Sequence, residues 1–230
     1  LQNSLDALRI VYDPKGLPEV HSRLIAANAL DTEDVAVVYV QITRGVAPRT
    51  HHFPPEGTPP TVYAFAQVYH RPESARWELG YEAITVPDHR WARVDIKAIG
   101  LLPNVLAQQA AVDAGVADAL LVKDDVALEG SHNNVFAVLN GVVTTHPATQ
   151  RILHGIAREY VMELARAQGL PVEERPVLLE EMRGAEEIFF TGTTTEVRPT
   201  VRLDGEPVGD GKVGPVAKAL YEAFKVGTQA

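Results

Sequence analysis

Hydrophobic and polar positions follow helical spacing at the start of the chain and strand spacing soon after it. Apolar residues recur every three to four positions over 1–11 and 17–28, which predicts two amphipathic helices separated by DPKG. Dense runs of valine and aromatic residues then predict strands over 34–43 and 59–69. The connection between these strands, RGVAPRTHHFPPEGT, is long and rich in proline and arginine, which is typical of a functional loop.

The rest of the chain mixes strands and helices without strict alternation. A polar, proline-broken segment over 69–80 predicts a linker between two domains, 1–71 and 72–230. Alternating apolar and charged positions predict a strand over 91–97. Pro199 is expected to interrupt a strand, and the chain then continues into a hairpin from Thr200 across DGEPV. The other expected elements are helices over 104–114, 151–168, 177–183 and 218–225, and strands over 119–122, 134–139 and 187–191 and after the turn Asn140-Gly141. This pattern predicts an α+β fold with two domains.

The first predicted helix begins in the middle of its own apolar stripe. Leu1, Leu5 and Leu8 share one face, and neither an initiator methionine nor a capping residue precedes them. We therefore expect a further segment upstream of Leu1.

Composition narrows the function classes. The chain has 230 residues and a formal charge of −9, which argues against a broad nucleic-acid or anionic-membrane surface, because both require clustered lysine and arginine. The sequence contains no cysteine, so it has no disulfides, thiolate metal ligands or cysteine nucleophiles. A reducing cytoplasm is the expected compartment, and no apolar run reaches the length of a membrane span. We expect no metal site.

Lys97 and Glu129 are the first candidates for chemistry. Lys97 either reaches solvent at the end of its strand or is a partly desolvated amine that can attack a carbonyl. Glu129, in LEGSHNNVF, either belongs to a polar turn or keeps a pyridine nitrogen protonated. A Schiff-base lysine and a carboxylate on the ring nitrogen are together what a pyridoxal phosphate site needs.

Anion-binding patterns accompany these two residues. GTTTE, over 192–196, offers hydroxyls and backbone N–H groups, although threonine runs also form ordinary strand surfaces. In HGIARE, Gly155 can begin a helix whose N-terminus binds phosphate. In the proline-rich loop, Arg49 and His51 stand two positions apart and can converge on one carboxylate, or they belong to a solvated loop.

Five segments together carry a resemblance to a known family. They are TRGVAPRTHHFP, RWARVDIKAIGLLPNVLAQQAA, LEGSHNNVF, THPATQRILHGIARE and FFTGTTTEVRP. In this order and spacing they resemble the fold-type IV pyridoxal-phosphate enzymes, and within them the D-amino acid transaminases, which the RGxxPRxH pattern favours. The resemblance covers nearly the whole chain. It implies a homodimer that binds pyridoxal 5'-phosphate and passes an amino group from a D-amino acid to a 2-oxo acid.

The resemblance also implies a domain structure and the cofactor contacts. Residues 1–71 match the remnant of a small N-terminal α/β domain, and 72–230 match a larger cofactor-binding domain with a mixed sheet or pseudo-barrel. Lys97 matches the Schiff-base lysine, which also moves the substrate proton, and Glu129 matches the carboxylate on the pyridine nitrogen. The remaining matches are Asn134 near the ring hydroxyl, Leu153 packing on the ring, and Ile156, Ala157 and Thr193 around the phosphate.

The substrate contacts and the departures follow from the same resemblance. Arg49 and His51 match a trap for the substrate α-carboxylate, which in such homodimers reaches the neighbouring subunit's site. Family members carry an N-terminal segment ahead of Leu1, with a tyrosine in the substrate pocket and an arginine on the phosphate. Gly192 and Ala157 stand where hydroxyl residues can stand. Losing one charge-assisted phosphate contact costs about 1.5–3 kcal/mol.

Other functions remain open from the residues alone. A branched-chain L-amino acid aminotransferase would use the same Lys97 and Glu129. A lyase of the aminodeoxychorismate type would release pyruvate without a 2-oxo acid acceptor. An incomplete chain that folds and dimerises without binding a cofactor is the alternative of another class.

Overall fold

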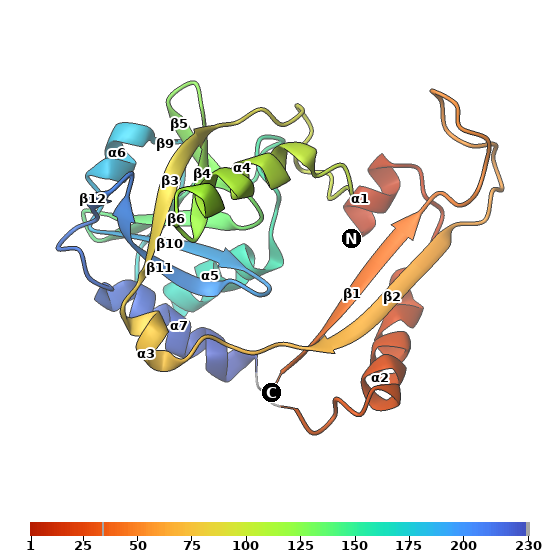
Figure 1. The fold of residues 1–230 in the computed structure, drawn as a ribbon, viewed down its shortest axis with the longest axis horizontal. Helices are drawn as coiled ribbons and strands as arrows, with labels where there is room; N and C mark the ends of the chain where they lie inside the picture. The colour runs from red at the N-terminus through yellow and green to blue at the C-terminus, as the bar shows by residue number, and fades with distance from the viewer. Residues whose placement is uncertain (34, 229–230) are drawn as a thin grey trace. The chain divides into compact units, whose positions relative to one another are not determined.

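A computed structural model describes residues 1–33 and 35–228. The chain divides into two compact units, Leu1–Arg71 and Pro72–Ala230 (Figure 1). Each unit is built around its own sheet.

The first unit is a two-stranded hairpin with short helices. Strands β1 (Ala36–Thr43) and β2 (Thr61–Val68) pair antiparallel, with Tyr39 opposite Phe65, and α2 (Leu17–Ala27) packs on them. Exposure alternates along β2, as expected for a strand with one covered face. The chain enters through α1 (Gln2–Ala7) and the 3-10 turn η1 (Pro14–Gly16). The helices and strands predicted here are confirmed, although α1 is shorter than predicted and position 34 lies outside the described residues.

The second unit is a large sheet covered by helices. Its helices are α3 (Ser74–Glu78), α4 (Leu102–Asp113), α5 (Ile156–Ala167), α6 (Leu179–Arg183) and α7 (Pro215–Gly227). Its strands are β3 (Tyr81–Pro87), β4 (Asp118–Lys123), β5 (Val126–Gly130), β6 (Asn134–Leu139), β7 (Val142–Thr145), β8 (Val172–Glu174), β9 (Val177–Leu178), β10 (Glu187–Gly192), β11 (Glu196–Leu203) and β12 (Glu206–Pro207). The order is β8-β7-β6-β10-β11-β3-β4-β5-β9, with β12 beside β11, and both parallel and antiparallel pairs occur.

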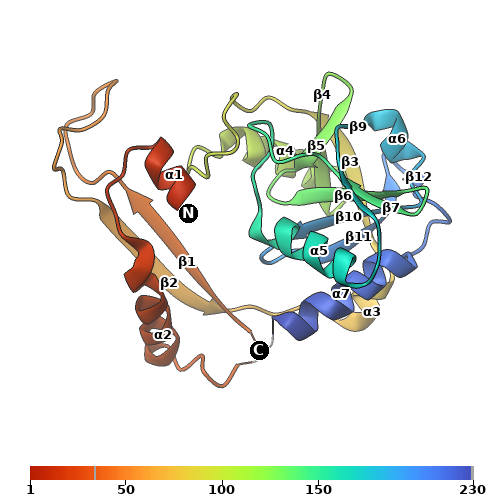
Figure 2. The ribbon, with the colours of Figure 1, turned by 180° about the vertical axis from the view of Figure 1, so that it is seen from behind.

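Side chains that alternate along the strands fill two cores on opposite faces of this sheet. Phe136 and Phe189 stack with their ring centroids 5.2 Å apart and face α5 and α7. These two helices lie together on that side of the strands (Figure 2). Ala137 and Phe190 point to the other face and share a core with Leu120 of β4. Because strands far apart in the sheet order share this second core, the sheet curls into a half-barrel, as the predicted mixed-sheet fold requires.

The connection between the units is shorter than the predicted linker. Trp77 of α3 is buried, stacks on Tyr221 of α7 at 4.3 Å between centroids, and donates a hydrogen bond to the Val197 carbonyl at 2.8 Å. The linker prediction over 69–80 is therefore wrong from α3 onward, because a buried tryptophan anchors that helix in the second unit.

The strand predicted over 91–97 is also wrong, because this segment is irregular. Arg93 and Asp95 pair with each other at 2.9 Å, and the Ile96 N–H turns back to the Arg93 carbonyl, so the chain bends instead of extending. The strand in this part of the sheet is β3, over 81–87, which the apolar pattern did not reveal.

Smaller differences occur at proline and glycine. Pro199 lies inside β11, which pairs with β3 only from Thr200 onward, so the proline has a sheet neighbour on one side alone. The helix predicted over 151–168 begins at Ile156, with Gly155 as its N-cap. The helix predicted over 177–183 begins at Leu179, after the short strand β9. The remaining predicted elements are confirmed within a few residues, including the Asn140-Gly141 turn.

Candidate active site

Glu129 is a buried carboxylate surrounded by hydrogen-bond donors. It lies near the end of β5 and is 4% exposed. Arg90 Nη1 donates to its Oε1, Asn134 Nδ2 donates to Oε2 at 2.8 Å, and the Leu153 N–H donates at 3.0 Å to Oε2. These three donors fix the carboxylate in one orientation.

The surroundings of Glu129 bring its proton affinity close to neutral pH. Burial raises the pKa of Glu129 to about 7, although the charge and hydrogen bond of Arg90 and the Leu153 N–H act in the opposite direction. A carboxylate with such a pKa accepts or holds a proton at physiological pH, which is common at functional sites.

Asn134 and Leu153 connect this carboxylate to the start of α5. Asn134 Nδ2 also donates to the Leu153 carbonyl at 2.9 Å. A side chain at Gly155 would overlap the Asn134 amide oxygen, so the close approach of the two segments requires glycine. The helix then starts at Ile156 without a side-chain cap in the described part of the chain. The first N–H groups of such a helix, here including that of Ala157, can bind an anion.

Thr193 belongs to a tight turn at the same end of the sheet. The turn joins β10 to β11, and Thr191 in β10 pairs with Asn134 in β6. Thr193 is exposed, whereas Thr195 is buried and its hydroxyl lies 3.4 Å from Asn133 Nδ2. The turn is thus anchored from inside and presents Thr193 outward.

Lys97 lies in the loop between β3 and α4 and is exposed. The loop is held at Val94, whose N–H donates to the Gln150 carbonyl at 2.9 Å, and by the buried side chain of Ile96. Gln150 belongs to the segment that leads to Leu153. The structure therefore joins Glu129, Asn134 and Leu153 directly, and attaches the segment that carries Lys97 to the same loop.

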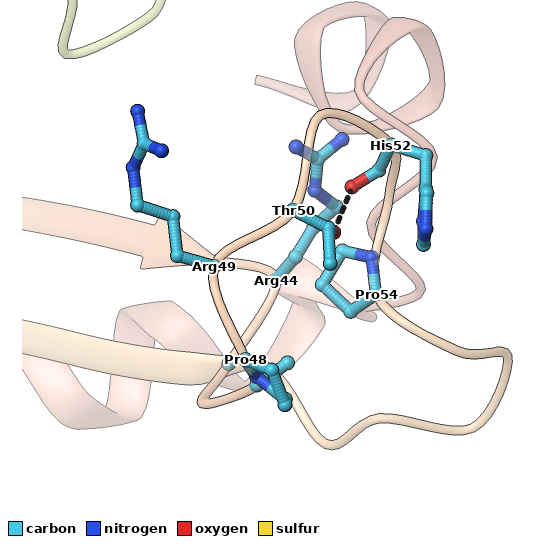
Figure 3. A pocket seen from close by; sticks show the side chains of 8 residues that line it. Arg44, Pro48, Arg49, Thr50, His52 and Pro54 are labelled. Atoms are coloured by element: carbon cyan, nitrogen blue, oxygen red, sulfur yellow. Dashed lines mark hydrogen bonds between the residues drawn. The ribbon is translucent and has the colours of Figure 1, made fainter.

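The proline-rich loop of the first unit forms a shallow hollow of about 270 Å³. Arg49 lines it and extends away from Thr50 and His52 (Figure 3). Thr50 Oγ1 donates to the His52 carbonyl at 3.0 Å, and Arg44 stacks on Phe53 at 3.6 Å from its centroid. His52 is among the lining residues, whereas the neighbouring His51, which the sequence indicated, is exposed outside that set. An exposed guanidinium group in such a hollow can bind a carboxylate.

Asp88 and Arg90 were missed in the sequence. Both precede the irregular segment and contact the Glu129 site from a loop. The only signal was a pair of opposite charges two positions apart, and such pairs are common at protein surfaces.

Two kinds of feature are absent from residues 1–33 and 35–228. Within these ranges no helix combines the length and apolarity needed to cross a membrane. The same ranges contain no cluster of three His, Cys, Asp or Glu side chains placed to hold a metal ion.

Comparison with known proteins gives the family. The amino-transferase class IV model matches residues 1–203, and the chain belongs to this family. The resemblance found in the sequence is thereby confirmed.

Curated relatives narrow the class further. The chain is 38% identical over 218 residues to a D-alanine aminotransferase of Staphylococcus aureus (strain MSSA476), covering 95% of this chain and 76% of the relative. It is 39% identical over 217 residues to the D-alanine aminotransferase of Staphylococcus haemolyticus, covering 94% of this chain and 76% of the relative.

Solved structures share the fold. A branched-chain amino acid aminotransferase from Escherichia coli aligns with a TM-score of 0.83 at 27% identity, over 97% of this chain and 75% of that one. A branched-chain aminotransferase from Thermoproteus uzoniensis, solved with norvaline, aligns with a TM-score of 0.81 at 25% identity, over 98% of this chain and 75% of that one.

Proposed function

We propose that this chain is a pyridoxal-phosphate-dependent transaminase that passes the amino group of a D-amino acid to a 2-oxo acid. The observation that carries the proposal is the buried, donor-held carboxylate of Glu129, in a chain whose curated relatives are D-alanine aminotransferases along 95% of its length.

The second unit offers a donor set that fits pyridoxal 5'-phosphate. Glu129 suits a protonated ring nitrogen, because it is a buried carboxylate that the protein's own hydrogen-bond donors already hold in one orientation. The uncapped start of α5, through the N–H groups of Ile156 and Ala157, and the hydroxyl of Thr193 suit the phosphate. Asn134 and Leu153 both donate to Glu129 and are hydrogen-bonded to each other, and we assign them to the cofactor ring. We assign residues 72–230 as the cofactor-binding domain on this basis.

When bound, pyridoxal phosphate supplies an aldehyde that condenses with amines and a ring that withdraws electrons from them. The chain's own contribution is acid–base chemistry at two atoms. Lys97 Nζ is the amine assigned to the aldehyde, and it takes and returns the proton at the substrate α-carbon. Glu129 holds the proton on the ring nitrogen, where burial strengthens the ion pair.

Substrate binding is assigned to the proline-rich loop. The Arg49 guanidinium can bind an α-carboxylate through two N–H groups, and we assign His51 as a second donor. The resemblance assigns this pair to the site of a neighbouring subunit, so we include a homodimer in the proposal. We also include a cytoplasmic location, supported by the absence of cysteine.

An apolar surface in the second unit supports a second copy of the chain as partner. Large apolar side chains there are 52–68% exposed at and before the first turns of α4, namely Ile99, Leu101, Leu102, Val105 and Leu106. A patch of this kind on a monomer marks an interaction site, and a two-fold dimer would cover it on both subunits.

Donor selectivity tests the proposal. The full chain, loaded with pyridoxal phosphate, is supplied with 2-oxoglutarate and either D-alanine or L-leucine, and Lys97→Ala serves as the inactive control. We expect 2-oxoglutarate to be converted to glutamate with D-alanine as donor. Preference for L-leucine would instead make the chain a branched-chain enzyme, and pyruvate release from aminodeoxychorismate without an acceptor would make it a lyase. No uptake of the cofactor would overturn the enzyme assignment.

A further inference from the structure

Glu129 forms a buried group of three charged side chains with Asp88 and Arg90. The proposed function gives a role to Glu129 alone. Arg90 Nε donates to Asp88 Oδ1 at 2.9 Å and Arg90 Nη2 donates to Asp88 Oδ2 at 3.1 Å, which is a bidentate pair. The remaining nitrogen, Nη1, donates to Glu129. Nη2 also lies 3.5 Å from the Arg151 carbonyl, and the Arg90 N–H donates to Asp88 Oδ1 at 2.9 Å. One guanidinium therefore serves two carboxylates.

All three side chains are almost completely buried, each about 5% exposed. Charges in such a place are weakly screened, so their sum matters more than it would at a surface. One arginine and two ionised carboxylates sum to −1. Among other charged groups, Lys123 acts on Asp88 from the end of β4, and the Arg151 guanidinium pairs with Asp124 at 2.6 Å.

The geometry divides the roles of the two acids. Asp88 takes both parallel N–H bonds of Arg90, whereas Glu129 takes only one and fills its other oxygen with Asn134. Asp88 is thus the main counter-ion of the arginine, and Glu129 keeps most of its own charge.

We infer that Asp88 and Arg90 are positioning residues that set the charge of Glu129: Arg90 fixes its carboxylate, and Asp88 neutralises Arg90. Glu129 then offers one uncompensated negative charge to the protonated ring nitrogen. The inference rests on the proposed function, because a cationic nitrogen opposite Glu129 is what the −1 charge matches.

Removal of the Asp88 charge and removal of Arg90 shift the pKa of Glu129 in opposite directions. Without the Asp88 charge, Arg90 interacts with Glu129 alone, the pair becomes neutral, and Glu129 holds a proton less strongly. Without Arg90, two carboxylates face each other in a buried site, and Glu129 holds a proton more strongly. A purely structural role for the pair would not produce shifts of opposite sign.

The first test needs no cofactor. The full chain, labelled with ¹³C at glutamate carboxyl carbons, is titrated by NMR, and Glu129→Gln identifies the signal. We expect Asp88→Asn to lower the pKa of Glu129 and Arg90→Gln to raise it, each by about one pH unit, a tenfold change in proton affinity. Asp124→Asn, which removes an exposed carboxylate on a neighbouring turn, should cause no shift.

Shifts of equal sign, or no shift in Asp88→Asn, would overturn the inference. If Arg90→Gln does not fold, Asp88→Asn decides alone, because asparagine keeps the size of the side chain and one acceptor for Arg90.

The second test uses the chain loaded with pyridoxal phosphate that carries ¹⁵N in its ring. Asp88→Asn should make the ring nitrogen lose its proton at a pH about one unit lower than in the unsubstituted protein. The ring ¹⁵N shift reports this without any turnover. Borohydride reduction and peptide mass at Lys97 are measured on the same sample, so a failure of cofactor attachment is seen separately from a failure of the charge argument.

Discussion

A carboxylate inside a sheet is costly unless donors replace the water it has lost. Glu129 obtains these donors from a loop arginine, a strand asparagine and a backbone N–H, that is from three separate segments. Its orientation is consequently a property of the folded second unit and not of its own neighbours in the chain.

The pH dependence of stability should reveal this carboxyl group. The pKa of Glu129 is raised from an ordinary value of 4.5 to about 7, so the folded state binds its proton more tightly than the unfolded state. Its contribution to stability is fully present below pH 4.5 and is lost as the pH rises to about 7. As the pH rises across that window, the free energy of unfolding of Glu129→Gln should therefore increase on the order of 3 kcal/mol relative to that of the unsubstituted protein. Urea unfolding of both proteins from pH 4 to 8 measures the difference, and parallel curves would contradict the prediction.

Lys97 gives the most direct test of the cofactor assignment. Lys97→Ala should lose the visible absorbance band that pyridoxal phosphate gives when it is linked to a lysine, because no other amine is assigned to the aldehyde. The exposed Lys212→Ala is the matched control and should keep the band. Survival of the band in Lys97→Ala would move the attachment to another residue.

Among the elements, α7 depends on a residue outside itself. Glu187, in β10, accepts the N–H groups of Val216 at 2.9 Å and Ala217 at 2.8 Å, and so caps the helix from a neighbouring strand. Gly214 precedes the helix where a side chain would overlap Glu187. The helix in turn covers the core around Trp77 and Phe136, so its start and the sheet beneath it are stabilised together.

Removal of this cap should lower the stability of the second unit. Glu187→Ala leaves two helix N–H groups without their acceptor, and we expect a loss of about 1–2 kcal/mol in the free energy of unfolding. Glu163→Ala, on the exposed side of α5, is the control and should change it by less than about 0.5 kcal/mol. Chemical unfolding monitored by tryptophan fluorescence compares them. An equal, small effect of both substitutions would show that water replaces the cap.

Elements with a strong internal pattern could be predicted from the sequence, and elements defined by their neighbours could not. The valine-rich strand β1 and the amphipathic α7 follow from their own residues. β3 was missed although Ile84, Thr85 and Val86 are typical strand residues, and its place in the sheet follows only from its pairing with β4 and β11. The segment over 91–97 has the right alternation, but it pairs with no strand among residues 1–33 and 35–228 and bends through its Arg93–Asp95 pair.

The candidate site divides in the same way. Glu129 stands in a short polar segment that the sequence pattern singled out, whereas Asn134 in the same segment was named only through the family resemblance. Arg90 acts on that segment from 39 positions away along the chain, with Asp88 beside it, and the role of both follows only from the contacts. The assignments of Lys97 and Arg49 remain predictions that the proposed substitutions test, and the assignment of His51 remains a prediction.

At the scale of the whole molecule, the two units of one chain contribute residues to different active sites of the proposed dimer. Lys97 belongs to the second unit and Arg49 to the first. If Arg49 serves the partner's site, a subunit that lacks Lys97 can still supply Arg49 to its partner. A subunit that lacks Arg49 can still use its own Lys97.

Mixing two inactive variants should therefore restore activity. A mixed dimer of Lys97→Ala and Arg49→Ala contains one site with both residues intact, so a statistical mixture should recover about a quarter of the unsubstituted activity. Activity is measured after joint refolding, with each variant refolded alone as control. No recovery, with mixed dimers present by native mass spectrometry, would place Arg49 in the site of its own subunit.

The parallel pairing of β3 with β11 bears on how the protein is made. β3 ends at Pro87 and β11 begins at Glu196, so the ribosome completes the first strand long before it synthesises the strand that lies beside it. Until then the growing polypeptide exposes an unsatisfied strand edge, which is prone to pair with other nascent chains. Expression yield should accordingly depend on chaperone supply more strongly than the stability of the finished protein would suggest.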